Sequence, residues 1–191
     1  MANSKIIIVE GAQGVGKTTI TDYIRDTLKH TNLYRLNGIS DSTKAGYEKS
    51  KKMYNNLLEY MEKMENLNIN LLFDRTFFSE ENYCRLGFKE YSFTDAYNEL
   101  IDKLAKLDFE IYYITVYLSD ETLFEQRLDR EGKAGPEYAK YKLENSIKQQ
   151  RVYLEMAEEV KRKYPQINVI NIDTNKDLEM VEKEIRDIIK Y

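Results

Sequence analysis

The fold is decided by the stretch Gly11-Ala12-Gln13-Gly14-Val15-Gly16-Lys17-Thr18, which directly follows the apolar run Ile6–Val9. The spacing GxxxxGK[ST], between an expected strand and an expected helix, is typical of a phosphate-binding loop. The glycines let the backbone turn and bring successive N–H groups onto phosphate oxygens, and the following helix adds the positive end of its dipole. We therefore expect the chain to bind a nucleotide, and not merely to contain a glycine-rich turn.

The residue types in this loop predict how the nucleotide and a metal ion would be held. Lys17 is expected to neutralise the β- and γ-phosphates, and the Thr18 hydroxyl is expected to ligate Mg²⁺. The residues expected to contact the nucleotide are Gly11, Ala12, Gln13, Gly14, Val15, Gly16, Lys17, Thr18 and Thr19.

Composition narrows the class of protein. The chain has 191 residues, 42% of them hydrophobic and 32% charged, which suits one domain with a substantial core. We recognise no signal peptide and no run suited to crossing a membrane. A net charge of -4 argues against a protein whose main ligand is a nucleic-acid backbone. Cys84 is the single cysteine, so an internal disulfide is impossible, and a cytoplasmic location is expected.

Strand-like and helical patterns alternate along residues 1–191. The expected strands are Ile6–Val9, Leu33–Leu36, Ile69–Phe73, Ile111–Leu118 and Ile167–Ile172. One long helical stripe consists of Tyr47, Tyr54, Leu57, Met61 and Met64. The alternation predicts a single α/β domain with a parallel sheet between two helical layers and ligands at the carboxyl ends of the strands. The stripe suits the core of such a domain or, alternatively, a homodimer interface.

A second candidate site follows the expected strand Ile69–Phe73. Asp74 and Arg75 stand at its carboxyl end, the edge at which a parallel sheet binds its ligands. A carboxylate there can hold Mg²⁺ through water or orient an acceptor, and a guanidinium can hold an acceptor phosphate by two parallel hydrogen bonds. An ordinary ion pair at a strand end is the alternative.

Aromatic residues come next in the chain. Phe77, Phe78 and Tyr83 could stack on a nucleobase, with Asn82 or Arg85 reading its polar edge. Aromatic residues at this spacing belong more often to a hydrophobic core.

A cluster of cations ends a later helical pattern. Arg127, Arg130 and Lys133 run into a glycine-containing loop, where cations could close over a transferring phosphoryl group and exclude water. Because acidic residues interleave with them, a solvated helix end is the alternative.

Three segments together make the chain resemble the thymidylate kinase family and its sister, the deoxynucleoside kinases. The segments are Val9–Thr19, Asp74–Tyr83 and Leu123–Lys133. In thymidylate kinases the second segment carries an Asp-Arg pair, a serine four positions after the arginine, and then a tyrosine. The matching residues here are Asp74, Arg75, Ser79 and Tyr83.

The resemblance implies a P-loop kinase three-layer sandwich with a five-stranded parallel sheet. It implies Mg²⁺- and ATP-dependent transfer to a deoxynucleoside monophosphate, with dTMP as the first candidate and a homodimer as a possible assembly. The residues that it places in catalysis are Lys17, Asp74, Arg75, Arg127 and Arg130, the last two in a lid around residues 127–140. The residues that it places on the substrate are Arg35, Arg75, Phe78, Ser79 and Tyr83, and those on the metal are Thr18 and Asp74. It also brings residues 173–176 near the adenine.

The chain departs from both families. Gln13 stands where thymidylate kinases usually carry an acidic residue, and Cys84 stands where a base-reading glutamine commonly follows the tyrosine. An Arg-Glu-Pro stretch is replaced by Arg35-Leu36-Asn37, which, with the other two changes, leaves thymine selectivity open. Deoxynucleoside kinases typically have Glu-Arg-Ser in place of Asp74-Arg75-Thr76.

Chemistry separates the two families. A nucleoside 5′-hydroxyl benefits from a general base, whereas a monophosphate attacks with an oxygen that is already anionic. Between Leu33 and the long helix, Asp41 is the only carboxylate. The lack of an obvious base favours a monophosphate acceptor, and a deoxynucleoside kinase remains the alternative. More distant alternatives are a polynucleotide end kinase and a nucleotide-binding module without catalysis, which would not need Asp74 and Arg75.

Overall fold

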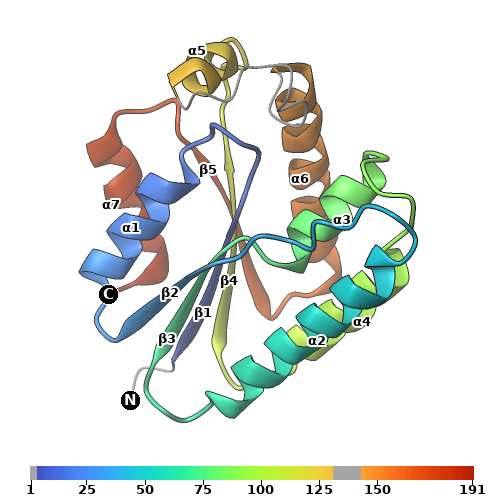
Figure 1. Ribbon diagram of the computed structural model, residues 1–191. Coiled ribbons are helices and arrows are strands. Elements are labelled where there is room, and N and C mark those ends of the chain that lie inside the picture. The colour runs from blue at the N-terminus through green and yellow to red at the C-terminus, as the bar shows by residue number, and fades with distance from the viewer. Residues whose placement is uncertain (1–3, 131–142) are drawn as a thin grey trace.

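Five strands form one parallel sheet in the order β2-β3-β1-β4-β5 (Figure 1). The strands are β1 (Lys5–Glu10), β2 (Thr31–Arg35), β3 (Asn70–Asp74), β4 (Glu110–Tyr117) and β5 (Ile167–Asp173). This computed structural model describes residues 4–130 and 143–191. Strand β1 is central and buried over its whole length, because helices cover both faces of the sheet.

Two helical layers enclose the sheet (Figure 1). One layer contains α1 (Lys17–Thr27) and α7 (Leu178–Ile189), and α5 (Leu123–Arg130) lies near the carboxyl ends of the strands. The other layer contains α2 (Gly46–Lys63), α3 (Phe77–Arg85), α4 (Thr94–Leu104) and α6 (Leu143–Lys163). The three-layer α/β sandwich expected from the sequence is therefore confirmed.

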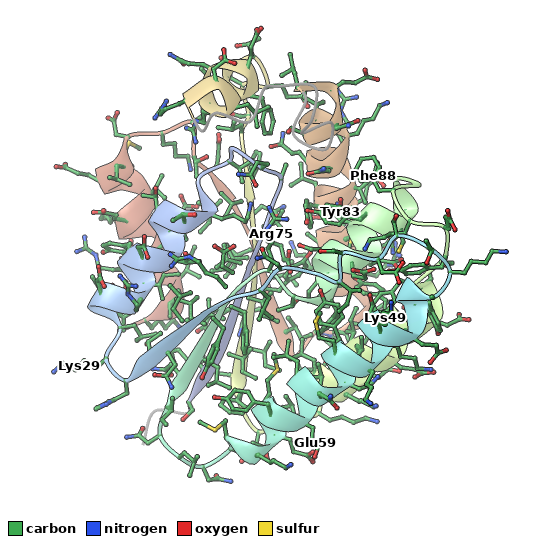
Figure 2. All side chains as sticks on the ribbon, in the orientation of Figure 1. Lys29, Lys49, Glu59, Arg75, Tyr83 and Phe88 are labelled. Atoms are coloured by element: carbon green, nitrogen blue, oxygen red, sulfur yellow. The ribbon has the colours of Figure 1, made fainter. Side chains whose placement is uncertain are left out.

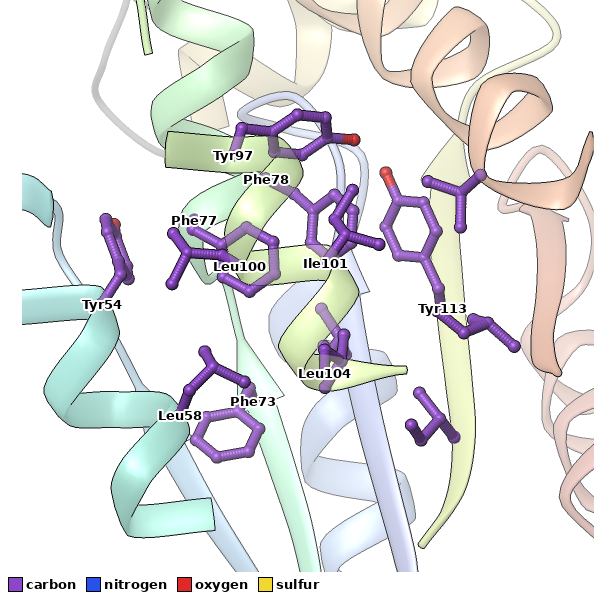
Figure 3. Close-up of a cluster of buried hydrophobic side chains, with 14 of the residues drawn as sticks. Tyr54, Leu58, Phe73, Phe77, Phe78, Tyr97, Leu100, Ile101, Leu104 and Tyr113 are labelled. Atoms are coloured by element: carbon purple, nitrogen blue, oxygen red, sulfur yellow. The ribbon is translucent and has the colours of Figure 1, made fainter. Parts of the chain in front are cut away.

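Alternation along the strands divides the core into two clusters, because successive side chains point to opposite faces of a sheet. Ile7 and Val9 pack with the α1 and α7 layer, whereas Ile6 and Ile8 pack with the other layer. Figure 3 shows the second cluster, in which aromatic and leucine side chains from α2, α3 and α4 meet β3 and β4.

The long stripe on α2 belongs mainly to this second cluster. Tyr54, Leu58 and Met61 are buried there, and Tyr47 and Leu57 pack against them partly buried. These contacts account for the apolar spacing of the helix by core packing. No helix in the described ranges is both long and apolar enough to span a bilayer.

Two helices follow the strands β3 and β4 after short turns. Helix α3 starts at Phe77, and α5 starts at Leu123. At the second start, Asp120 Oδ1 accepts hydrogen bonds from the backbone N–H and the hydroxyl of Thr122. This local turn competes with the helix and delays it by one turn.

Candidate active site

The loop between β1 and α1 has the geometry that its glycines predict. A Cβ on Gly11 would lie 2.6 Å from the carbonyl oxygen of Val116, and Gly16 has a φ of 97°. Both positions therefore require glycine. Lys17 is buried, and its Nζ donates hydrogen bonds of 2.9 Å to the carbonyl oxygens of Gly11 and Ala12. The ammonium group thus lies against the loop that would hold the phosphates.

A cavity of about 680 Å³ opens beside this loop at the carboxyl ends of β2 and β3. Its volume is in the range of pockets that hold small molecules. The predicted site residues that line it are Gln13, Gly14, Gly16, Lys17, Thr18, Thr19, Arg35, Asp74, Arg75, Ser79 and Tyr83. Folding therefore brings the phosphate-binding loop, the Asp-Arg pair and α3 around one space.

Arg75 contacts both helix α3 and the phosphate-binding loop. Figure 2 labels it together with Tyr83 of α3. Its Nη1 donates to the Tyr83 hydroxyl, and its Nη2 donates to Gln13 Oε1 at 3.1 Å. The residue has a φ of 73°, a left-handed conformation that costs a non-glycine residue about 1–2 kcal/mol. The backbone is held there by a 3.1 Å hydrogen bond from the Arg75 N–H to the Val9 carbonyl oxygen. Strain of this kind persists where the surrounding structure fixes a functional side chain.

Asp74 and Thr18 offer oxygen atoms of the kind that Mg²⁺ binds. Both line the cavity, and Asp74 is only 7% exposed. Mg²⁺ in phosphoryl-transfer sites uses one or two protein oxygens together with substrate phosphates and water. These two residues therefore fit the ion without a larger acidic cluster. Arg35 lies beside them, with its Nε 3.6 Å from Asp74 Oδ2 and its Nη2 2.6 Å from Asp22 Oδ1.

Glu10 is a buried carboxyl group to which the sequence assigns no structural role. Its Oε1 accepts hydrogen bonds from the Thr76 N–H at 2.7 Å and the Thr76 hydroxyl at 3.0 Å, and its Oε2 accepts one from Ser79 at 2.6 Å. Ser79 Oγ also lies 2.8 Å from the Tyr153 hydroxyl. Glu10 thereby satisfies N-terminal donors of α3 and fixes the segment that follows Arg75. The sequence signal for this role is that Glu10, a charged residue, directly follows the apolar run Ile6–Val9.

The environment of Glu10 predicts a pH-dependent stability. Burial raises the pKa of this carboxyl group from 4.5 to about 7, although its hydrogen bonds and Arg75 oppose the shift. Between pH 4.5 and about 7 the folded chain therefore binds more protons than the unfolded chain. The stability that Glu10 contributes is fully present below pH 4.5 and is lost as the pH rises through 7. We expect a loss of about 3 kcal/mol in the free energy of unfolding over this window.

Urea denaturation at several pH values measures this effect. A Glu10→Gln variant keeps the size of the side chain and is expected to show a flatter profile between pH 5 and pH 8, because it has no proton to lose. Equal pH dependence in the two proteins would contradict the assignment.

The predicted lid arginines take different positions. Arg127 lies beside the phosphate-binding loop, where its Nη1 would be 3.4 Å from a Cβ on Gly16 and its Nη2 donates to the Thr174 carbonyl oxygen at 3.1 Å. Thr174 in turn donates to the Val15 carbonyl oxygen at 2.6 Å, so the turn after β5 contacts the phosphate-binding loop. Arg130 is exposed at the end of α5, and neither arginine lines the 680 Å³ cavity. Lys133 and residues 131–140 of the expected lid lie outside the described residues.

The expected base-stacking role of Phe78 is corrected by the structure. Its ring is fully buried and stacks on Tyr113 with ring centroids 4.1 Å apart, and Phe77 is buried beside it (Figure 3). Asn82 and Arg85 direct hydrogen bonds to α6 and not to the cavity. Helix α3 therefore presents its aromatic face to the core and its Ser79 and Tyr83 face to the site, because residues four apart share a helix face.

The fold is shared with solved structures. The Candida albicans thymidylate kinase has a TM-score of 0.70 at 16% identity, covering 100% of this chain and 92% of that chain. The YorR protein of Bacillus subtilis, in complex with phosphorylated GDP, has a TM-score of 0.67 at 21% identity over 97% of this chain and 95% of that chain. The chain has the P-loop kinase fold.

A third similar structure is the deoxyadenosine kinase of M. mycoides, with the products dCMP and dCDP bound. Its TM-score is 0.59 at 20% identity, and the match covers 97% of this chain and 98% of that chain. No family model matches the sequence, and no curated protein matches it either.

Proposed function

We propose that this protein transfers the γ-phosphoryl group of ATP to the phosphate of a deoxynucleoside monophosphate in a Mg²⁺-dependent reaction. The proposal rests on the position of Arg75, which lies next to the phosphate-binding loop and lines the same cavity as the loop. Its guanidinium has five N–H donors, of which hydrogen bonds to described residues occupy two. The remaining donors suit two parallel hydrogen bonds to an acceptor phosphate.

The surroundings of two carboxylates, Asp41 and Glu10, favour a phosphate acceptor over a hydroxyl acceptor. Asp41, the base candidate from the sequence, is held by Lys49 Nζ at 2.6 Å and by Thr43, and these hydrogen bonds lower its pKa to about 2. It does not line the cavity in the described part of the chain. Both oxygens of Glu10 accept hydrogen bonds from Thr76 and Ser79. A monophosphate oxygen attacks without such a base.

The chemistry is positioning and charge neutralisation. The acceptor oxygen forms a bond to the γ-phosphorus as the bond to the ADP oxygen breaks, and negative charge spreads over the group in transit. Lys17 and the loop N–H groups stabilise this charge, while Arg75 fixes the direction of attack. Thr18 and Asp74 would hold Mg²⁺, which neutralises phosphate charge when bound. Arg127 is near enough to the loop to take part.

The sequence pattern favours dTMP as the acceptor, and a deoxynucleoside kinase is the second candidate. The second candidate is favoured by one observation, the structural likeness to a deoxyadenosine kinase. Under either function the ligands are small, a nucleoside monophosphate or a nucleoside as acceptor and ATP as the phosphoryl donor.

A turnover assay separates these candidates. ATP and Mg²⁺ are supplied with each of four deoxynucleosides and four deoxynucleoside monophosphates, and Lys17→Ala protein controls for contaminating kinases. We expect ADP and a nucleoside diphosphate from one or more monophosphates. Turnover of nucleosides alone would replace the proposal by the second candidate.

A further inference from the structure

The segment between β2 and α2 contains a dipeptide that is prone to chemical change. Asn37 is the only asparagine of the sequence that is followed by glycine, Gly38. Both residues are exposed, lie outside the helices and strands, and line the cavity. The pair is therefore open to solvent and at the same time forms part of the wall of the candidate site.

The chain is held on either side of this pair but not at the pair itself. The Leu36 N–H donates to the Asp74 carbonyl oxygen at 3.1 Å, and the Ile39 carbonyl oxygen accepts a hydrogen bond from Lys89 Nζ at 2.7 Å. Between these two anchors, no described residue forms a hydrogen bond with the asparagine side chain or with the glycine N–H. The amide carbon and the backbone nitrogen that follows it are therefore not protected by hydrogen bonds to the described chain.

The packing around Gly38 favours a residue without a side chain. A Cβ there would lie 3.3 Å from Glu80 Oε2 and 3.6 Å from the Tyr54 hydroxyl. The first separation is tighter than an ordinary contact, and both neighbouring side chains are buried and have little room to move. Glycine also leaves its own nitrogen open to attack, because no side chain shields it. The residue that fits this wall is thus the one that leaves Asn37 most reactive.

We infer that Asn37 is a site of spontaneous deamidation, at which the chain converts its own amide into a carboxylate in the wall of the cavity. The Gly38 nitrogen forms a bond to the side-chain carbonyl carbon of Asn37, and the amide nitrogen leaves as ammonia with the proton of the Gly38 N–H. Water then opens the cyclic imide at either of its carbonyl carbons, which gives aspartate or isoaspartate. Asparagine is among the thermolabile residue types of proteins.

Both products place a negative charge where the proposed function requires an anion to bind. Arg35, the cation nearest in sequence, already faces Asp22 at 2.6 Å and Asp74 at 3.6 Å. A like charge about 4 Å away in water lowers affinity by about fivefold. The activity toward the acceptor is therefore expected to fall as the protein ages. This consequence rests on the proposed function, whereas the modification itself does not.

Mass spectrometry of tryptic peptides tests the modification directly. Cleavage after Arg35 and Lys44 releases residues 36–44, in which Asn37 carries the only side-chain amide. Native protein and urea-unfolded protein are aged side by side at mildly alkaline pH, and the mass gain from replacing the amide nitrogen by oxygen is followed with time. Because no described residue bonds the reacting groups, we expect the native chain to convert at a rate similar to that of the unfolded chain. A native chain that keeps its asparagine while the unfolded chain converts would overturn the inference.

Three variants locate the reaction and its effect. Asn37→Gln keeps an amide, but attack by the next nitrogen would have to close a larger ring, so we expect no mass gain in this peptide over the same period. Asn37→Asp has the charge of the product from the start, and we expect KM for the acceptor to rise about fivefold while KM for ATP is kept. Asn32→Asp is the matched control for charge, because Asn32 is exposed on β2 and is not among the described residues that line the cavity. We expect it to leave both KM values unchanged.

Activity during ageing separates this inference from the proposed function. At an acceptor concentration below KM, the activity of the wild type should fall in step with the converted fraction of the peptide, and Asn37→Gln should keep its activity. Equal loss of activity in the two proteins, or a wild-type KM in Asn37→Asp, would overturn the effect on the acceptor site. If the fresh enzyme turns over no monophosphate, the proposed function fails, but conversion of residues 36–44 in the native protein still supports the modification site.

Discussion

Replacing Arg75 by alanine is expected to lower kcat/KM for the acceptor by about 10²–10⁴ while the affinity for ATP is kept. The guanidinium lines the cavity and contacts the loop through Gln13, so it is placed to hold the acceptor next to the donor. Two hydrogen bonds to a charged group, each about 1.5–3 kcal/mol, account for the magnitude. Steady-state kinetics in the acceptor and equilibrium binding of ATP measure the two quantities.

Arg75→Lys distinguishes geometry from charge. Lysine keeps the charge but lacks the planar pair of donors, so we expect it to restore only a small part of the activity. Arg85→Ala is the control. Arg85 ends α3, the helix that follows Arg75, and it pairs with Glu81 and Glu159 and is not among the described residues that line the cavity. If Arg75→Ala kept wild-type kcat/KM, Arg75 would not hold the acceptor.

Lys17→Ala is expected to lower kcat by about 10²–10³ with every acceptor. The ammonium group lies against the Gly11 and Ala12 carbonyl oxygens, within the loop that we propose to hold the donor phosphates. Removing it leaves the charge of the phosphoryl group in transit without its nearest protein cation.

Lys29→Ala serves as the comparison for this variant. Lys29 is exposed beyond the opposite end of α1, away from the loop (Figure 2), so its loss is expected to leave kcat unchanged. Circular dichroism shows whether each variant is folded. Full activity of a folded Lys17→Ala protein would contradict the assignment of the donor site.

The features of the fold and the site that could be predicted from the sequence are those with a recognisable pattern within one short stretch of chain. The loop from Gly11 to Thr18 has fixed spacing, and the strands are short apolar runs, so the sheet and the position of the loop beside it could be predicted. Asp74 and Arg75 were found because they end a recognisable strand. Phe78 was misplaced because helical spacing alone does not say which face of α3 meets the core.

Other parts of the site depend on contacts between distant segments. Glu10 and Ser79 are 69 positions apart, and Lys89 reaches Ile39 across 50 positions. Sequence periodicity does not show such contacts, so the role of Glu10 emerged only with the fold.

The most direct test of phosphoryl transfer from ATP to a monophosphate is ³¹P NMR of the protein with ATP, Mg²⁺ and the deoxynucleoside monophosphate that binds most tightly. We expect the single monophosphate resonance to be replaced by the two coupled resonances of a nucleoside diphosphate as ATP becomes ADP. A monophosphate resonance that stays constant while ATP is consumed would contradict phosphoryl transfer to a phosphate acceptor.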